Sequence, residues 1–567
     1  MLACQRSLIH IQSRAFSGVS TRGMAQKRPF VGGKKHFKNK KQKKATTSDG
    51  SSEDVLLMDV RNLLQKTSLT EEPPKEQDFP EQFSEIELSI SELSSTGDGL
   101  AMKDGQVYVV PFAAPGDTVL AKVYKTFHEE RYSLADFQGV TIPSEHRTET
   151  PRCPYFASCS GCQFQHLPYS FQLAHKRKVV EKAYQNFSSL PASAVPIVGE
   201  TIGSPLQYGY RTKLTPHFDG PPGGRRDNRS GKKPTWLEVP PIGFMKKGTR
   251  KTIDIEDCPI GTDAVRVGMK AERARVTVLI DTYRRGATLL LRENTERVHK
   301  ADHAAREHIL SDGLVSEDRG DHYHLKTCIT DHNATSTEYV DDFRFDNPAG
   351  SFFQNNNSIL PLVTQYIRDN ILASTMAHSN ESHPKVTNLI DAYCGSGFFT
   401  VALSSLFKNS IGIDISAQSI ASANTNAKLN NLPPSSTRFI AADANELFSS
   451  VDKTTFPPAD TVVIIDPPRK GCDENFIRQL TNYGPQRICY VSCNVHTQAR
   501  DVGWLVKDSE GADGSPVLGM YEIESLRGFD FFPQTSHVEG VAILRKRGAA
   551  AATDEMPAVN GDTISAT

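Results

Sequence analysis

The sequence has no long hydrophobic run and contains little cysteine. No apolar stretch reaches the roughly 18 residues that a membrane-spanning helix needs, so we expect no membrane association. Ten cysteines among 567 residues are too few for a secreted disulfide scaffold, and no hydrophobic signal core precedes them. We therefore expect reduced thiols in an intracellular compartment. Nothing in the sequence indicates an obligatory protein partner.

Net charge is close to zero, at -1, but the charges are unevenly distributed. The first 48 residues carry 12 Lys or Arg and no acidic residue, and subtracting these from the total of 65 leaves 53 basic against 66 acidic side chains. Because the remainder is acidic, a polyanion would have to be held by a local basic groove or by the N-terminal tail.

The N-terminal 30 residues combine Arg6, Arg14 and Arg22 with serine and short apolar patches, a composition typical of a mitochondrial presequence. Initiation at Met24 would remove most of this segment and leave the lysine run 34–44 near the new terminus. That run would serve as a nuclear signal, an RNA tether or an unstructured solubilising tail. We therefore expect a mitochondrial, nuclear or cytoplasmic location, with dual targeting through Met1 and Met24.

The length predicts several compact units with tails. Residues 1–82 are expected to be a disordered basic N-terminus with a Ser-, Glu- and Pro-rich linker from 46, and residues 548–567 a disordered tail. Apolar alternations broken by Gly and Pro predict a small β-barrel over 83–144, either of the oligonucleotide-binding type or a structural module without ligand.

Residues 145–345 form a central mixed domain that is harder to interpret. A helix is expected near 171–187, and the runs RVTVLID (275–281) and TLLLRE (288–293) have the composition of strands. The Gly- and Arg-rich loop 220–233 would either contact RNA phosphates or be a solvated insertion.

In residues 346–547, strand and helix patterns alternate. The expected strands are VTNLIDA, SIGIDI, TRFIAAD, TVVIID, RICYVSC and EGVAILRK, with a helix in AQSIASANTNAKLN. This alternation predicts a doubly wound α/β sheet with its ligand at the carboxyl ends of the strands.

The first of these strands ends in DAYCGSGFF, which places Asp391, Gly395 and Gly397 in the turn that opens the next helix. The second ends at Asp414, where a carboxylate would accept both ribose hydroxyls of a nucleoside cofactor. The third ends at Asp443, near the expected adenine. The glycine pattern differs from the dinucleotide fingerprint, so the motif looks like an S-adenosylmethionine pocket of class I methyltransferases.

The fourth and fifth strands end in Asp466-Pro-Pro-Arg469 and Ser492-Cys493-Asn494. Neighbouring strand ends would bring a thiol and a carboxylate into one pocket. A single Cys at a strand end is usually a small buried apolar residue. This one follows DPPR and precedes the run Phe532 to Glu539 (FPQTSHVE), which favours a chemical role.

The set DPPR, SCN and FPxTxHxE, with Phe353-Gln354-Asn355 upstream, resembles the RNA uracil-5-methyltransferases of the branch that carries a TRAM barrel and a cysteine cluster. The resemblance covers roughly residues 85–547. It implies a class I S-adenosylmethionine-dependent methyltransferase fold and methylation of carbon 5 of a uridine in RNA. The substrate would be the T-loop uridine, position 54, of tRNA, or alternatively ribosomal RNA.

The resemblance also assigns roles to individual residues. Gln354, Tyr393, Asp414 and Asp466 would line the cofactor site, Cys493 would be the nucleophile and Glu539 the general base. Two positions depart from the pattern, because many relatives have Glu in place of Asp414 and some bacterial relatives have Asn in place of Phe398.

The chemistry gives a separate reason for these groups. Carbon 5 of uracil is too electron-poor to attack a sulfonium methyl, so a thiolate must first add to carbon 6. Methyl transfer leaves a proton on carbon 5, and a carboxylate must remove it before the thiol is eliminated. The target uridine must also leave its base stack.

Three cysteines lie close together in the sequence, Cys153, Cys159 and Cys162, with Cys258 much further along. The resemblance implies that these four hold a 4Fe–4S cluster. Zinc could use the same four sulfurs, and reduced structural cysteines are the remaining alternative.

Three other functions compete with this interpretation. A cytosine-5-methyltransferase normally draws its thiol from a different motif and lacks a carboxylate after FPxTxH. An exocyclic amine methyltransferase would have an aromatic residue in place of Arg469 and no thiol. A non-catalytic RNA-binding or tRNA-folding factor would not need both Cys493 and Glu539.

Overall fold

The computed structural model describes residues 50–67, 79–221, 236–302, 314–372, 386–443, 447–448, 450–510 and 516–547, with the side chains of 508–517 left out. The chain divides into two units, Met1–Thr46 and Thr47–Thr567, and the first lies wholly outside the described residues. The expected presequence, the second start at Met24, the lysine run, nearly all of the Gly- and Arg-rich loop and the C-terminal tail also lie outside them.

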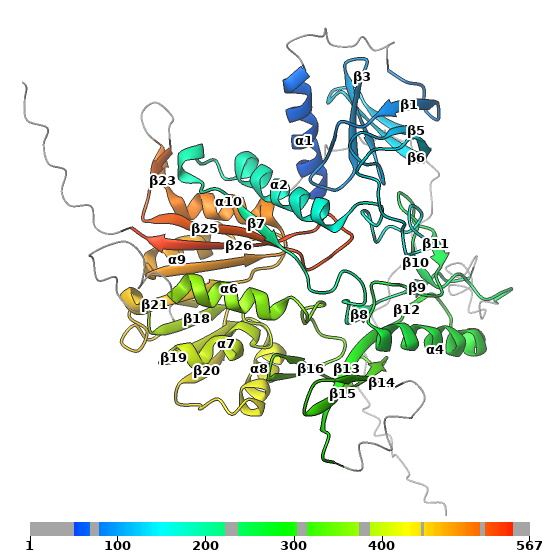
Figure 1. The fold of residues 1–567 in the computed structure, drawn as a ribbon. Coiled ribbons are helices and arrows are strands. Elements are labelled where there is room, and N and C mark those ends of the chain that lie inside the picture. The colour runs from blue at the N-terminus through cyan, green and yellow to red at the C-terminus, as the bar shows by residue number, and fades with distance from the viewer. Residues whose placement is uncertain are drawn as a thin grey trace, which may run out of the picture. The chain divides into compact units, whose positions relative to one another are not determined.

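The first described domain is a six-stranded barrel-like sheet with strand order β1-β5-β6-β4-β3-β2 (Figure 1). Its strands are β1 (Glu85–Ser89), β2 (Glu92–Leu93), β3 (Gly99–Lys103), β4 (Gln106–Val110), β5 (Thr118–Phe127) and β6 (Tyr132–Ile142). Leu88, Tyr108, Val119 and Ala135 are buried together inside it. The alternating apolar pattern of this segment therefore predicted the strands correctly.

A helix precedes the barrel where the sequence suggested only a disordered linker. Helix α1 (Ser52–Thr67) packs Val60 and Leu63 against Leu100, Val107 and Val109 of the barrel (Figure 1). The prediction of disorder was wrong for these residues because their apolar side chains recur at helical spacing and find a partner surface on the barrel.

The central region contains α2 (Tyr169–Phe187), α4 (Asp263–Leu279) and short antiparallel strands. These strands are β8 (Lys213–Leu214), β9 (His217–Phe218), β10 (Gly243–Met245), β11 (Thr252–Asp254), β12 (Ala287–Thr288), β13 (Leu291–His299), β14 (Val315–Asp318), β15 (His322–Ile329), β16 (Thr335–Val340) and β17 (Phe343–Pro348). The run RVTVLID is not a strand, since most of it forms the end of α4. Burial of Val265, Met269 and Val276 on one helical face outweighs the local strand preference of β-branched residues.

The last domain is built on an eight-stranded sheet with order β20-β19-β18-β21-β22-β26-β25-β7. Its strands are β18 (Asn388–Ala392), β19 (Asn409–Asp414), β20 (Thr437–Ala441), β21 (Thr461–Ile465), β22 (Arg487–Ser492), β25 (Tyr521–Phe529), β26 (Glu539–Lys546) and β7 (Gly199–Ile202), and a small hairpin adds β23 (Lys507–Glu510) and β24 (Pro516–Leu518). All six expected strands are present. Strand β25 was not predicted from the sequence, nor was the addition of β7 from the central region to this sheet.

Helices cover both faces of the sheet, as expected for a doubly wound fold. The helices are α6 (Leu360–Leu372), α7 (Phe398–Leu403), α8 (Ala417–Leu429), α9 (Glu474–Tyr483) and α10 (Val495–Val506). One core packs α2, α9 and α10 on the sheet, and a second packs α6 and α7 on the opposite face (Figure 1). Strands β18 to β22 run parallel, so their carboxyl ends lie along one edge.

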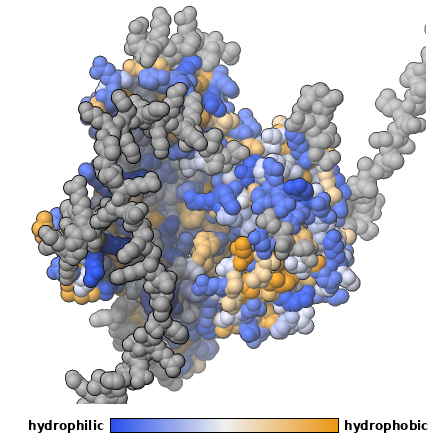
Figure 2. Space-filling view, turned by 180° about the vertical axis from the view of Figure 1, so that it is seen from behind, coloured by the Kyte–Doolittle hydropathy of each residue, from blue (hydrophilic) through white to orange (hydrophobic). Residues whose placement is uncertain are grey.

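On the face shown in Figure 2, hydrophilic residues predominate and apolar residues gather in smaller groups. None of the helices in the described ranges is long and apolar enough to cross a membrane.

Candidate active site

A cavity of about 1080 Å³ lies at the carboxyl ends of the parallel strands. Its wall includes every residue that the sequence assigned to cofactor binding or catalysis: Gln354, Tyr393, Asp414, Asp466, Cys493 and Glu539. Asp443 lines it as well. Residues nearly 200 positions apart in the chain therefore meet at one site, as expected for a ligand site at the carboxyl ends of parallel strands.

Asp414 joins the turn after β18 to the start of α8. One carboxylate oxygen accepts a hydrogen bond from Gly395 N at 3.0 Å, and the other accepts from Ser416 N at 2.8 Å. Ser416 in turn caps α8 by accepting from Ser419 N. The Asp side chain, one methylene shorter than Glu, is thus held by backbone amides at the edge of the cavity.

Asp391 is completely buried behind this turn and does not line the cavity. Its Oδ2 accepts hydrogen bonds from Thr400 N at 3.0 Å and from Thr400 Oγ1 at 2.6 Å. Burial raises the pKa of this carboxyl to about 7. Asp391 therefore holds the turn against helix α7 rather than facing a ligand.

The loop that carries Gln354 is fixed from two sides. Asn355 O accepts from Thr212 N at 2.9 Å, and the fully buried Asn356 donates through Nδ2 to Ser204 Oγ and to Phe531 O, each at 3.0 Å. These bonds fix the loop between β17 and α6, so that Gln354 lines the cavity.

Phe398, where some relatives have a polar residue, lies at the cavity wall and is mostly buried. Its ring packs edge-on against Phe353, with 6.1 Å between the ring centroids. Phe398 therefore makes an apolar contact with the Phe353-Gln354-Asn355 segment at the position where some relatives have a polar side chain.

The register of the sheet places Cys493 beside Glu539. Strands β22 and β26 are antiparallel, and Ser492 lies opposite Gly540. Since Cys493 follows Ser492 and Glu539 precedes Gly540, the two side chains belong to adjacent positions on neighbouring strands. Both line the same cavity.

The protonation states of the two groups depend on burial and on the charges around them. Burial, then Glu539 and Asp466, raises the pKa of the Cys493 thiol to about 12, while Arg469 opposes the rise through its charge and a hydrogen bond. Burial and then Asp466 raise the pKa of Glu539 to about 8, again opposed by Arg469. At neutral pH the protein therefore holds a thiol and mostly a neutral carboxyl, and Arg469 favours the ionised forms of both.

A second group of residues, not found from the sequence, supports the loop that leads to Glu539. Gln163 Oε1 accepts from Ser536 N at 3.0 Å, while its Nε2 donates to Thr96 O in the barrel at 2.7 Å. The backbone N of Gln163 also donates to Gln534 O at 2.7 Å. One side-chain amide from the cysteine segment thus connects the barrel to the loop 530–538, which leads to Glu539 and is called the catalytic loop below.

The barrel turn at this junction requires glycine. Gly97 has φ +88°, and a Cβ there would lie 2.6 Å from Gln163 Nε2 and 2.8 Å from Ser536 Cβ. The absence of a side chain therefore allows the turn to approach the catalytic loop closely.

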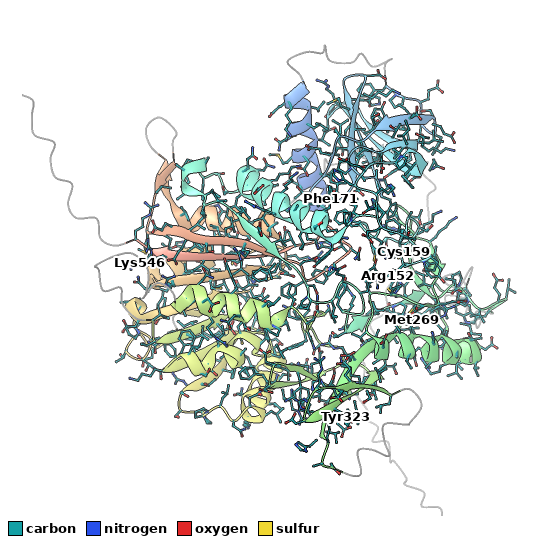
Figure 3. All side chains as sticks on the ribbon, viewed as in Figure 1. Arg152, Cys159, Phe171, Met269, Tyr323 and Lys546 are labelled. Atoms are coloured by element: carbon teal, nitrogen blue, oxygen red, sulfur yellow. The ribbon has the colours of Figure 1, made fainter. Side chains whose placement is uncertain are left out.

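The four cysteines of the expected cluster lie near one another in the central region. Burial, then Cys258, Cys153 and Cys159 among other groups, raises the pKa of the Cys162 thiol to about 12. Figure 3 shows Cys159 beside β10 and β11, in agreement with its β-bridge to Lys246. Among the described residues, no three or more His, Cys, Asp or Glu side chains are arranged to hold a metal ion.

The sheet order, the cavity and its residues define a class I S-adenosylmethionine-dependent methyltransferase fold. Comparisons with known protein families and solved structures support this assignment. The family model described as tRNA (Uracil-5-)-methyltransferase matches residues 300–547, and the TRAM domain model matches 81–135. A solved structure of Pyrococcus abyssi tRNA (uracil-54, C5)-methyltransferase in complex with S-adenosyl-L-homocysteine covers 81% of this chain and 100% of its own, with TM-score 0.54 and 21% identity. At that identity it supports the fold alone.

Two relatives are much more similar in sequence. The tRNA (uracil(54)-C(5))-methyltransferase of Schizosaccharomyces pombe is 42% identical over 538 residues, which are 94% of this chain and 89% of the relative. The protein of the same description from Saccharomyces cerevisiae is 40% identical over 88% of this chain and 79% of its own length. The chain belongs to the tRNA (uracil-5-)-methyltransferase family.

Proposed function

We propose that this protein transfers a methyl group from S-adenosylmethionine to carbon 5 of uridine 54 in tRNA, with Cys493 as the nucleophile and Glu539 as the base. The observation that carries the proposal is the register of β22 and β26, which brings the thiol and the carboxyl together in the cavity that Asp414, Gln354 and Tyr393 also line. The two yeast relatives are tRNA (uracil(54)-C(5))-methyltransferases, which supports the choice of substrate.

The cavity fits S-adenosylmethionine in size and in the polar groups it offers. Asp414 would hold the ribose hydroxyls at the edge of the glycine turn, and Gln354, Tyr393 and Asp466 would contact the rest of the molecule. When bound, the cofactor supplies an electrophilic methyl group on a sulfonium sulfur.

The chain's own residues perform the covalent part of the reaction. Cys493 Sγ, as thiolate, forms a bond to carbon 6 of the uracil and pushes electrons toward carbon 5, which then takes the methyl group. Glu539, as carboxylate, removes the proton from carbon 5, the electrons re-form the 5,6 double bond, and the bond from carbon 6 to sulfur breaks. Arg469 favours the thiolate, because its positive charge and hydrogen bond lower the pKa of Cys493.

The test is methylation of defined transcripts by the purified full-length chain with S-adenosylmethionine labelled on the methyl group. We expect label in 5-methyluridine of a tRNA transcript and none in the same transcript with cytidine at position 54. Label in a ribosomal RNA fragment instead would favour the ribosomal alternative. RNA binding without label would indicate the non-catalytic RNA-binding alternative.

We also propose that Cys153, Cys159, Cys162 and Cys258 hold a 4Fe–4S cluster. Support comes from four thiols of the right type in one region, whose charges affect one another's pKa values. As described, the thiols are not arranged around a metal, so no step of the reaction is assigned to a cluster.

Analysis of protein purified without oxygen should find about four iron and four sulfide per chain. Cys162→Ser should lose them, whereas Cys328→Ser, which alters a cysteine outside this group, should keep them. About one zinc per chain would favour the zinc alternative. If no metal is found, the four residues are reduced structural cysteines and the cluster proposal is wrong.

A further inference from the structure

Helix α1 is anchored to three separate parts of the protein. Besides its apolar contact with the barrel, Asp59 accepts a hydrogen bond from Ser95 N in the barrel at 2.6 Å and pairs with Lys182 of α2 at 3.2 Å. Asn62 also donates to Asn186 of α2 at 3.2 Å. These contacts connect the barrel to the helix layer of the catalytic domain.

The third anchor lies next to the nucleophile. Asn494, which follows Cys493, donates through Nδ2 to Gly50 O and to Arg469 O, each at 3.1 Å. Gly50 is buried against α10 with φ +71°, and a Cβ there would lie 2.8 Å from Thr497 Cγ2. The start of α1 is therefore held directly against the segment that presents the thiol.

A second cavity, of about 720 Å³, lies between these parts and opens on Cys493. The start of α1 forms one wall through Gly50, Ser51, Ser52 and Val55. The barrel turn at Ser95 to Asp98 and the catalytic loop form other walls. No residue of α1 lines the larger cavity that carries the cofactor-site residues.

The charges around the second cavity favour an anion. Arg469, Lys470, Lys247 and Arg500 line it, with Asp98 as the acidic member. Asp98 neutralises Lys247 at 3.0 Å, and Arg500 pairs at 2.7 Å with Asp501, so Arg469 and Lys470 supply the excess positive charge. A polar cavity with this charge beside the reactive thiol suits the sugar-phosphate backbone of an RNA strand.

We propose that α1 is part of the RNA-binding surface, and that its first turn walls a cavity that takes the backbone of the nucleotides next to the target uridine. This inference rests on the proposed function and extends it to an element outside the barrel and the catalytic domain. It predicts that changes at the start of α1 affect the use of RNA and leave cofactor binding alone.

Ser51 allows a sharp test because its role in the helix tolerates a negative charge. Its Oγ accepts from Asp54 N at 3.2 Å, as an N-cap side chain does. Asp and Asn both cap helices well, and a negative charge is favourable at a helix N-terminus, so neither Ser51→Asp nor Ser51→Asn should weaken α1. The two variants differ only in one charge on the cavity wall.

We expect Ser51→Asp to raise the KM for a tRNA transcript about tenfold over that of Ser51→Asn, the effect of one like charge near a phosphate at a protein surface. The difference should shrink as salt is added. The kcat of both variants and their dissociation constant for S-adenosylmethionine, measured by calorimetry, should match those of the wild type.

Equal KM values for the two variants would overturn the proposal, and so would a matching loss of cofactor affinity, since that would indicate a general structural effect. If the wild type and Ser51→Asn both fail to methylate any transcript, the proposed function itself is wrong. If all three proteins methylate tRNA with the same KM, only the role of α1 is wrong.

Discussion

Cys493→Ala should abolish methyl transfer to tRNA, with a fall in rate of at least about 10⁴-fold, as found when enzymes lose their nucleophile. Without the sulfur, carbon 5 of uracil is not activated toward the methyl donor. The affinity for S-adenosylmethionine should stay within about twofold of the wild type, because the other cavity residues are unchanged. Transfer of labelled methyl and calorimetric titration with the cofactor measure the two effects.

Cys489→Ala is the matched control for this variant. Cys489 lies in β22, the strand that leads to Cys493, but it is fully buried and lines neither cavity. We expect it to lower stability through loss of packing and to keep activity. Methyl transfer by Cys493→Ala above about one hundredth of the wild-type rate would show that another group activates the uracil.

Glu539→Gln should stop the reaction after methyl transfer, one step later than Cys493→Ala, and leave the protein covalently bound to its RNA. The amide cannot remove the proton from carbon 5, so turnover should fall by about 10²- to 10⁴-fold. The bond from Cys493 to carbon 6 forms before this step, so a covalent complex should accumulate in the presence of cofactor. A slowly migrating band of labelled RNA on a denaturing gel measures it, and the band should be absent from the double variant that also carries Cys493→Ala. Without such a band, Glu539 would not be the base.

The pH dependence should report the same carboxyl. Because the pKa of Glu539 is raised to about 8, the base is mostly protonated at neutral pH, and wild-type turnover should rise between about pH 6 and pH 8 as the carboxylate forms. A rise that continued unchanged beyond about pH 9 would mean that the thiol, with its pKa of about 12, controls the rate.

The stability of the wild type should fall over the pH range in which its turnover rises. The pKa of Glu539 is higher in the folded than in the unfolded protein, so between the two pKa values the folded state holds a proton that the unfolded state has lost. The free energy of unfolding of the wild type should therefore fall from about pH 5 up to about pH 8. The amide of Glu539→Gln does not titrate, so the free energy of unfolding of this variant should not fall for this reason. Urea unfolding at pH 5 and at pH 8 measures the effect. The free energy of unfolding of the variant, relative to that of the wild type, should increase as the pH rises.

The catalytic sheet could be predicted because its central strands are short apolar runs that end in polar motifs. Strand β21 is buried at every position and is followed at once by Asp466. Strand β22 is likewise buried throughout and leads into Cys493. The rule that ligands bind at strand carboxyl ends then places these motifs together. The pairing of Cys493 with Glu539 also depends on the register of β26, which only the structure shows.

Other features depend on contacts that no local pattern reveals. Strand β7 has four residues and joins the sheet by pairing with β25, which lies more than 300 residues further along the chain. Helix α1 is stabilised by its contact with the barrel, and the Ser-, Glu- and Pro-rich sequence around it suggested disorder. Gln163 connects the barrel to the catalytic loop through hydrogen bonds across long sequence separations. Its importance could not be read from its residue type.

The position of β26 in the sheet has a consequence for how the enzyme is made. This final strand inserts between β22 and β25, and it begins with Glu539. A ribosome therefore completes the strands around the proposed cofactor pocket and the Cys493 thiol before it adds Glu539, the proposed base. A chain that ended early would leave the edge of β22 unpaired, which favours aggregation, and it would carry the proposed nucleophile without the carboxyl that we propose as the base. Premature termination near the C-terminus should thus be as damaging as loss of the whole domain.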